Sequence, residues 1–143
     1  LGGQYFLPGL VTLAHLLCFP VNGFSLLRFL EGLRSGETIL RRSSVEQMTK
    51  NRLTPQQAQT YWMAGYGYGL GVRTMIDRAS DGNLSPLGEF GWGGVLGTYM
   101  AADPEQKVTI VYAMQVEPNP ERRALRSTLR NLVYAALEYE GIL

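Results

Sequence analysis

Phe90-Gly91-Trp92-Gly93-Gly94-Val95-Leu96-Gly97-Thr98-Tyr99 is the most informative part of this sequence. Four of its residues are glycines, one tryptophan stands among them, and an alternating apolar segment follows. Glycine in a strand loses packing and backbone entropy, so it usually marks a place where another group approaches the main chain closely. Two interpretations stay open on spacing alone: a glycine-rich turn that enters an ordinary hairpin, or a strand edge that a substrate approaches.

Composition limits the class of protein. The chain has 143 residues, of which 45% are hydrophobic, and this suits one domain that buries about two-thirds of its unfolded surface. Thirteen basic and twelve acidic residues give a net charge of +1, so we expect no nucleic acid partner. One cysteine (Cys18) and one histidine (His15) permit no internal disulfide and no histidine-rich metal site, and we expect no cofactor. No secretory signal is visible, and the compartment stays unknown.

Residues 1–24 form an apolar segment of uncertain status. They belong to a run of 27 residues without Asp, Glu, Lys or Arg, and a membrane span needs about 20 apolar residues. Pro8 and Pro20 would interrupt such a span, so a buried, irregular element is expected and a membrane is not. His15 and Cys18 are interpreted as core residues, because a catalytic Cys–His pair would lack an orienting third group.

Three short helices and a strand are predicted after this segment. Ser25 can cap a helix that Gly36 ends, and a second helix with a capping box at Ser43 or Ser44 spans about 43–51. Thr54-Pro55-Gln56-Gln57 is a stronger start signal for a third helix, since it combines a Thr cap, Pro at the first position and Gln three residues after the cap.

Residues 65–76 predict one strand with two unlike faces. Alternation places aromatic and aliphatic side chains on one side and four glycines on the other (Gly65, Gly67, Gly69 and Gly71). We interpret the glycine face as structural, because no turn and long helix follow to make a dinucleotide-binding fingerprint. Residues 78–89 predict a loop.

Two further strands and a helix complete the prediction. Val95–Ala101 and Lys107–Gln115 predict an antiparallel pair, and the second strand is apolar on both faces, as a covered central strand is. Asn119-Pro120 predicts the start of a C-terminal helix. Its apolar stripe is expected to face the core (Leu125, Leu129, Leu132, Val133, Ala136 and Leu137), and its arginines are expected in solvent (Arg122, Arg123, Arg126 and Arg130). A phosphate-binding arginine row is the alternative. The fold class is therefore α+β, an antiparallel β-sheet with a C-terminal helix packed on it and short helices before it.

The order of these elements is informative in itself. A Tyr-Gly-Leu-Gly strand at 68–71 precedes Phe-Gly-Trp-Gly-Gly at 90–94, a hairpin with Asp-Pro-Glu at 103–105, and the final helix. Over residues 25–143 this order resembles the C-terminal part of the serine beta-lactamase and penicillin-binding-protein superfamily, in its class C-like esterase branch. The resemblance implies a partial beta-lactamase/transpeptidase-like fold.

The resemblance also implies roles for the tryptophan motif. In that superfamily a Lys-Thr-Gly motif lies on a core strand, and Trp92-Gly93-Gly94 matches its position. Gly93 and Gly94 would let a substrate lie against the strand edge, and the main-chain N–H of Val95 would donate to an oxyanion. Trp92 replaces a lysine, so it would line the acyl pocket and favour uncharged ester or acyl substrates over penicillins.

Two other motifs of the superfamily are missing. No Ser or Thr is followed by Lys three positions on, and no Tyr or Ser is followed by x-Asn. Ser127 reaches Arg130 instead, and an arginine stays protonated and cannot act as a base. We therefore expect the C-terminal portion of a serine hydrolase that is inactive alone and takes a small acyl or ester substrate only when an upstream region completes it.

Alternatives from other classes stay open. One is a non-catalytic relative that binds a peptide, acyl or cell-wall ligand. Another is an α+β interaction module that associates with a membrane through residues 5–24. The front end also departs from the family, because residues 15–24 read as inserted or replaced. An unpartnered sheet edge is expected to favour self-association.

Overall fold

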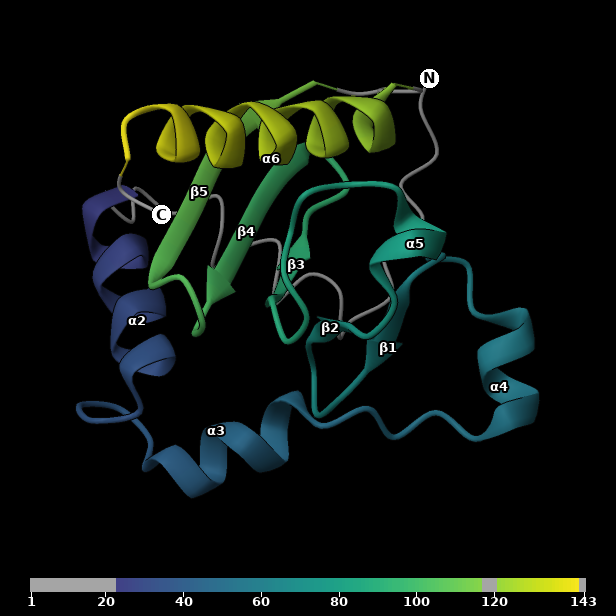
Figure 1. Ribbon diagram of the computed structural model, residues 1–143. Coiled ribbons are helices and arrows are strands. Elements are labelled where there is room, and N and C mark those ends of the chain that lie inside the picture. The colour runs from purple at the N-terminus through teal and green to yellow at the C-terminus, as the bar shows by residue number, and fades with distance from the viewer. Residues whose placement is uncertain (1–22, 117–120, 142–143) are drawn as a thin grey trace, which may run out of the picture.

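The computed structural model describes residues 23–116 and 121–141, and its centre is a five-stranded antiparallel sheet. Each strand pairs with its neighbour in sequence, in the order β1-β2-β3-β4-β5 (Figure 1). The strands are β1 (Tyr66–Tyr68), β2 (Arg73–Met75), β3 (Phe90–Gly93), β4 (Gly97–Asp103) and β5 (Val108–Gln115). This meander is built from local connections only, and it confirms the predicted antiparallel sheet.

Helices cover both faces of the sheet. They are α2 (Gly23–Ser35), α3 (Arg42–Thr49), α4 (Pro55–Thr60), α5 (Arg78–Asp81) and α6 (Arg122–Tyr139). Tyr134 of α6 packs in one apolar cluster with Ala101 of β4, and Leu33 of α2 packs in a second cluster with Ala102. Because successive residues of a strand point to opposite faces, α6 and α2 lie on opposite sides of β4. The α+β fold class and the packed C-terminal helix are confirmed (Figure 1).

The glycine-rich segment forms two strands instead of the one predicted. The chain turns between Tyr68 and Arg73, and Gly71 has a φ of +85° that L side chains rarely adopt. The predicted close packing on the glycine face is confirmed, because a Cβ on Gly69 would lie 2.0 Å from the carbonyl oxygen of Met48. Gly67 similarly lies against Asn51.

The predicted helix start is confirmed for α4 and wrong for α2 and α3. Thr54 caps α4 with the predicted capping box, since its Oγ1 accepts from Gln57 N–H and the Gln57 side chain accepts from Thr54 N–H. The predicted caps of the first two helices are wrong: α2 already includes Gly23, and the cap position of α3 is Arg41 without a side-chain bond. Residues 78–81 form the short helix α5 within the predicted loop.

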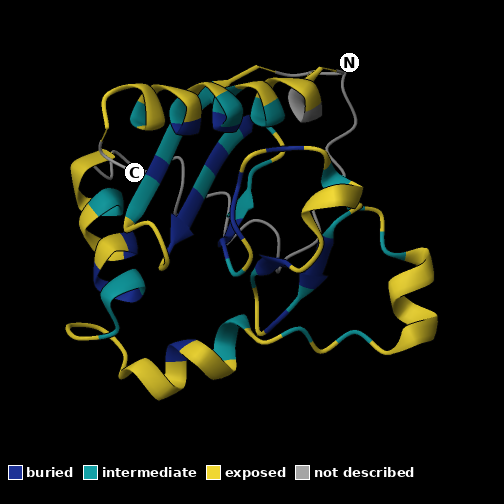
Figure 2. Ribbon diagram, in the orientation of Figure 1, coloured by how far each residue is buried: buried dark blue, intermediate teal, exposed yellow. Residues whose placement is uncertain are grey.

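The orientation of α6 differs from the prediction. Arg130 is 5% exposed and donates to Tyr66 of β1, whereas Leu132 is 64% exposed. Exposed, intermediate and buried residues alternate along α6 (Figure 2). The reason is a tertiary contact, since the carboxyl groups of Asp81 and Glu89 lie beside Arg130 and compensate its charge. β5 is also an edge strand of the described sheet and not a central one, although α2 and α6 both pack on it.

Several sequence predictions fall outside the described residues. These are the irregular segment at 1–22, with His15 and Cys18, and the Asn119-Pro120 helix start. Within 23–116 and 121–141, no helix is long and apolar enough to cross a membrane. The same ranges hold no group of three or more His, Cys, Asp or Glu side chains placed to bind a metal ion.

Candidate functional site

A cavity of about 890 Å³ lies between α6 and the ends of the central strands. All four residues singled out in the sequence border it: Trp92, Gly93, Gly94 and Val95. The remaining lining residues come from the segment after α4, from β1, β2, α5 and β4, and from α6. They are Trp62, Met63, Ala64, Tyr66, Arg73, Asp81, Tyr99, Ala124, Arg126, Ser127 and Arg130. The structure therefore brings the tryptophan motif to the wall of a pocket.

Val95 lies in a tight turn between β3 and β4, not in the strand that the sequence predicted from Val95 onward. Gly94 N–H donates to Thr98 O at 2.8 Å, and Gly97 N–H donates to Gly94 O at 3.3 Å. Gly97 has a φ of +99°, which favours glycine at this position. The turn places Val95 at the cavity wall, and the residue is 53% exposed.

Arg126 of α6 fixes the same turn by direct hydrogen bonds. Its Nη2 donates to Gly94 O at 2.7 Å and to Thr98 O at 3.0 Å. A Cβ on Gly93 would lie 2.6 Å from Arg126 Cζ, so the missing side chain of Gly93 makes room for this guanidinium. The arginine that was predicted to face solvent is thus a wall of the site.

Aromatic rings form another wall. Trp92 meets Tyr68 edge to face, with the ring centroids 5.4 Å apart, and Tyr68 in turn lies 6.3 Å from Tyr61. Tyr61 lies 6.1 Å from the ring of Trp62. Such pairs add to the free energy of burial and fix ring orientation. Trp92 is therefore held in place by packing from β1 and from the segment after α4.

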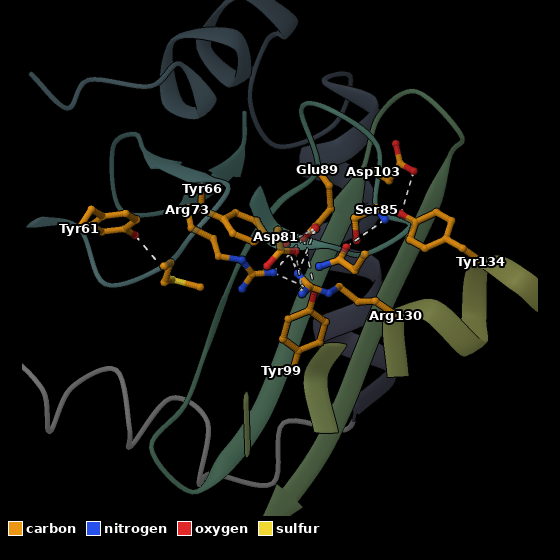
Figure 3. A network of polar contacts seen from close by, with 12 residues as sticks. Tyr61, Tyr66, Arg73, Asp81, Ser85, Glu89, Tyr99, Asp103, Arg130 and Tyr134 are labelled. Atoms are coloured by element: carbon orange, nitrogen blue, oxygen red, sulfur yellow. Dashed lines mark hydrogen bonds and ion pairs between the residues drawn. The ribbon is translucent and has the colours of Figure 1, made fainter. Parts of the chain in front are cut away.

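A buried network of ionisable side chains lies beside the cavity, and Arg73, Asp81 and Arg130 of this network border it (Figure 3). Arg73 donates to Glu89 Oε1 at 2.9 Å and to the Tyr99 hydroxyl at 2.8 Å. The Tyr66 hydroxyl donates to Glu89 Oε2 at 2.9 Å. Burial raises the pKa of Glu89, and the positive charge of Arg73 opposes that shift. A buried carboxylate of this kind needs its cationic partner.

Arg130 extends this network to α5. It donates to the Tyr66 hydroxyl and lies 3.2 Å from Asp81 Oδ2 and 3.6 Å from Glu89 Oε2. Burial lowers the pKa of Arg130 to about 10, so it stays protonated at neutral pH. Burial, and then the negative charge of Glu89, raise the pKa of Asp81 to about 6. The positive charges of Arg73 and Arg130 are thus compensated by the carboxyl groups of Asp81 and Glu89.

The network was not predicted from the sequence. Its one visible signal is Arg73, a charged residue that interrupts the apolar alternation of residues 70–76. Nothing in the sequence indicates that Glu89 or Arg130 is its neighbour, because these two residues lie 16 and 57 positions after Arg73 along the chain.

A nucleophile with a base is not assembled in the described part of the chain. Ser127 borders the cavity, but the residue one turn later is Arg130, which is protonated and already bonded. No lysine is among the described residues that line the cavity. The site therefore offers the Val95 turn and an aromatic wall, and its described residues show no activated hydroxyl.

The family assignment rests on a match along most of the chain. The family model named Beta-lactamase matches residues 22–135. The chain belongs to the beta-lactamase family. Solved structures of this fold agree: simvastatin synthase (LovD6 mutant) from Aspergillus terreus aligns with a TM-score of 0.68 at 20% identity, and EstCE1, described as a hydrolase with promiscuous acyltransferase activity, aligns with 0.64 at 24%.

These matches cover only part of each relative. The alignments take in 80% of this chain and 34% of the simvastatin synthase chain, and 78% of this chain and 29% of EstCE1. The uncharacterized protein MT1414 and protein Rv1367c, both of Mycobacterium tuberculosis, are each 32% identical over 98 residues, which is 62% of this chain and 24% of theirs. This beta-lactamase-family chain spans about a quarter of the length of these curated relatives.

Proposed function

We propose that this chain supplies one wall of the acyl-transfer site of a serine hydrolase, with the main-chain N–H of Val95 as an oxyanion donor. The observation that carries the proposal is the turn after Trp92, which borders the cavity at the end of β3. Backbone donors held rigidly at such a place can stabilise the negative oxygen of a tetrahedral intermediate. The bonds from Arg126 to Gly94 and Thr98 support the rigidity that this role needs.

Trp92 and the two following glycines would bind the acyl part of the substrate. An indole at this position offers an apolar, polarisable wall and no positive charge for a substrate carboxylate. The aromatic packing of Trp92 on Tyr68 supports a fixed wall. A small, uncharged ester is therefore the substrate class that fits best.

The nucleophile and its base would come from outside this chain. The sequence contains no Ser-x-x-Lys, and Arg130 cannot take the base's role for Ser127. Two of the solved relatives are about three times longer than the segment they share with this chain, which leaves room for such residues in a longer polypeptide. The isolated chain should accordingly be inactive.

The experiment compares the isolated chain with the intact gene product. The upstream reading frame is sequenced, the mass of the native polypeptide is measured, and both proteins are assayed with p-nitrophenyl butyrate. We expect turnover only by a polypeptide that contains an upstream Ser-x-x-Lys. Turnover by the isolated chain from two independent purifications, or an intact gene product without that motif, would contradict the proposal.

Val95→Pro tests the oxyanion role within the active polypeptide. Val95 is the second residue of its turn, a position that favours proline, and it is not among the non-glycine residues with positive φ, so this substitution is chosen to remove the N–H. Loss of one oxyanion donor lowers kcat by about 10² to 10³. Val95→Ala keeps the N–H and is the matched control. An unchanged kcat in Val95→Pro would exclude the donor role.

A non-catalytic binding protein is the second candidate, and the missing Ser-x-x-Lys favours it. In that case the cavity binds an acyl or peptide ligand without turning it over. Ligand-dependent fluorescence of Trp92 would report binding. If Trp92→Ala leaves the affinity of every bound ligand unchanged, the cavity is not the binding site.

A further inference from the structure

Several planar side chains belong to residues that border the cavity, among them Trp62, Trp92 and Arg126. Trp62 was not singled out in the sequence, and it reaches the site from the segment after α4. The two indoles are the only tryptophans of the chain. Both border the cavity, although the proposed oxyanion role requires neither indole.

Trp62 is half open to solvent although it is the largest apolar residue type. Its side chain is 56% exposed, while the run of rings from Tyr61 through Tyr68 connects it to Trp92. Tyr61 is anchored in turn, since its hydroxyl donates to Met63 Sδ at 3.7 Å. Trp62 borders the cavity, and an exposed indole that neighbouring rings support offers a flat apolar surface of the kind that ligands contact.

Arg126 presents a second flat surface. Its guanidinium is oriented by the two hydrogen bonds to Gly94 and Thr98 and lies against Gly93. Guanidinium planes stack on aromatic rings, and aromatic faces also attract their positive charge. A flat ring bound in the cavity can therefore stack on an indole or on this guanidinium.

We propose that the cavity selects esters that carry a planar aromatic ring, and that Trp62 is the residue that determines this specificity. The ester part of the inference rests on the proposed function, whereas the preference for a planar ring rests on the wall alone. A saturated ring of similar size buries a similar apolar area, but it has no π face and cannot stack. We therefore expect the cavity to bind planar rings more tightly than saturated rings.

The test is a binding experiment on the isolated chain. The two indole N–H signals in a ¹H–¹⁵N spectrum are assigned with Trp62→Phe and Trp92→Phe. Methyl benzoate and methyl cyclohexanecarboxylate are then titrated as matched probes, and phenyl acetate shows whether the ring is preferred on the acyl or the alcohol side. We expect both indole signals to shift and methyl benzoate or phenyl acetate to bind about fivefold more tightly than the saturated ester.

Variants separate the role of Trp62 from general hydrophobicity. Trp62→Leu should abolish the preference for the planar ring, and Trp62→Phe should keep most of it. Leu87→Ala, which removes a 55% exposed leucine that does not line the cavity, should change neither affinity. Because Trp62 is more than half exposed, Trp62→Leu is expected to fold, and its spectrum confirms this.

The outcomes distinguish this inference from the proposed function. The proposed specificity would be contradicted by equal affinities for the planar and saturated esters or by no shift of either indole signal. A preference that survives Trp62→Leu would contradict it as well. Those results would leave the Val95 experiment unaffected. A planar-ring preference that accompanies an unchanged kcat in Val95→Pro would keep the specificity and exclude the oxyanion role.

Discussion

Arg73 and Glu89 form an ion pair of 2.9 Å whose side chains are 2% and 0% exposed. The pair joins β2 to the residue before β3, and the Arg73 guanidinium lies 4.7 Å from the ring centroid of Tyr66 and 4.8 Å from that of Tyr99. A buried pair adds little net stability compared with apolar residues, but breaking it leaves an uncompensated charge. The buried network beside the cavity therefore depends on both partners together.

Replacing one partner should lower the free energy of unfolding much more than replacing both. Glu89→Gln leaves Arg73 and Arg130 facing one fewer carboxylate, and we expect the free energy of unfolding to fall by about 3 to 5 kcal/mol. The double variant Arg73→Met/Glu89→Leu should regain much of that loss. Urea denaturation measures both. A loss below about 1 kcal/mol in Glu89→Gln would mean that the pair is not buried as described.

Gly69 should tolerate alanine less well than its neighbour Gly71. The added Cβ of Gly69→Ala would lie 2.0 Å from Met48 O, a main-chain atom that cannot move away cheaply. We expect a loss of about 3 kcal/mol, at the upper end for overpacking. In Gly71→Ala the φ of +85° is strained but no atom lies within 4 Å, so about 1 kcal/mol is expected. Equal losses in thermal or urea unfolding would contradict the packing of α3 on this segment.

Arg126→Met should loosen the Val95 turn without unfolding the sheet. The variant keeps most of the side-chain stem but removes the donors to Gly94 O and Thr98 O. Each charge-assisted bond of this kind contributes about 1.5 to 3 kcal/mol, so the amides of Gly94 and Gly97 should exchange with solvent about tenfold faster or more. Hydrogen exchange of Ala101, which pairs within the β3–β4–β5 ladder, is the internal control. Unchanged protection at Gly97 would show that the turn is rigid without Arg126.

The sequence predicts local features of this molecule better than long-range ones. The capping box of α4 follows from four consecutive residues, and the β4–β5 hairpin follows from alternation and a short connection. The face that α6 buries could not be predicted, because the carboxylates that compensate Arg130 come from positions far away in the sequence. The position of Val95 in a turn and the contact of Gly93 with Arg126 depend in the same way on how α6 crosses the sheet.

The attachment of α2 to β5 should depend on pH in the acid range. Glu31 accepts from Thr109 Oγ1 at 2.7 Å and from Arg34 Nε at 2.8 Å, and hydrogen bonding to Arg34, the largest cause, lowers the pKa of Glu31 to about 2. Because this pKa is depressed in the folded state, its contribution is present above about pH 4.5 and is lost as the pH falls through about 2. Glu31 is 48% exposed, so solvent screening limits the contribution to about 1 kcal/mol.

Glu31→Gln should therefore lower the free energy of unfolding at pH 7 and match the wild type near pH 2. Glu46→Gln is the control, since Glu46 faces Arg42 at 3.6 Å in a largely exposed pair that contributes at most about 0.5 kcal/mol. Urea unfolding across this pH range separates the two variants. If the difference between Glu31→Gln and the wild type is the same at pH 2 and pH 7, then the Glu31 carboxylate does not anchor α2, and apolar packing of Leu33 on Phe90 and Ala102 holds the helix alone.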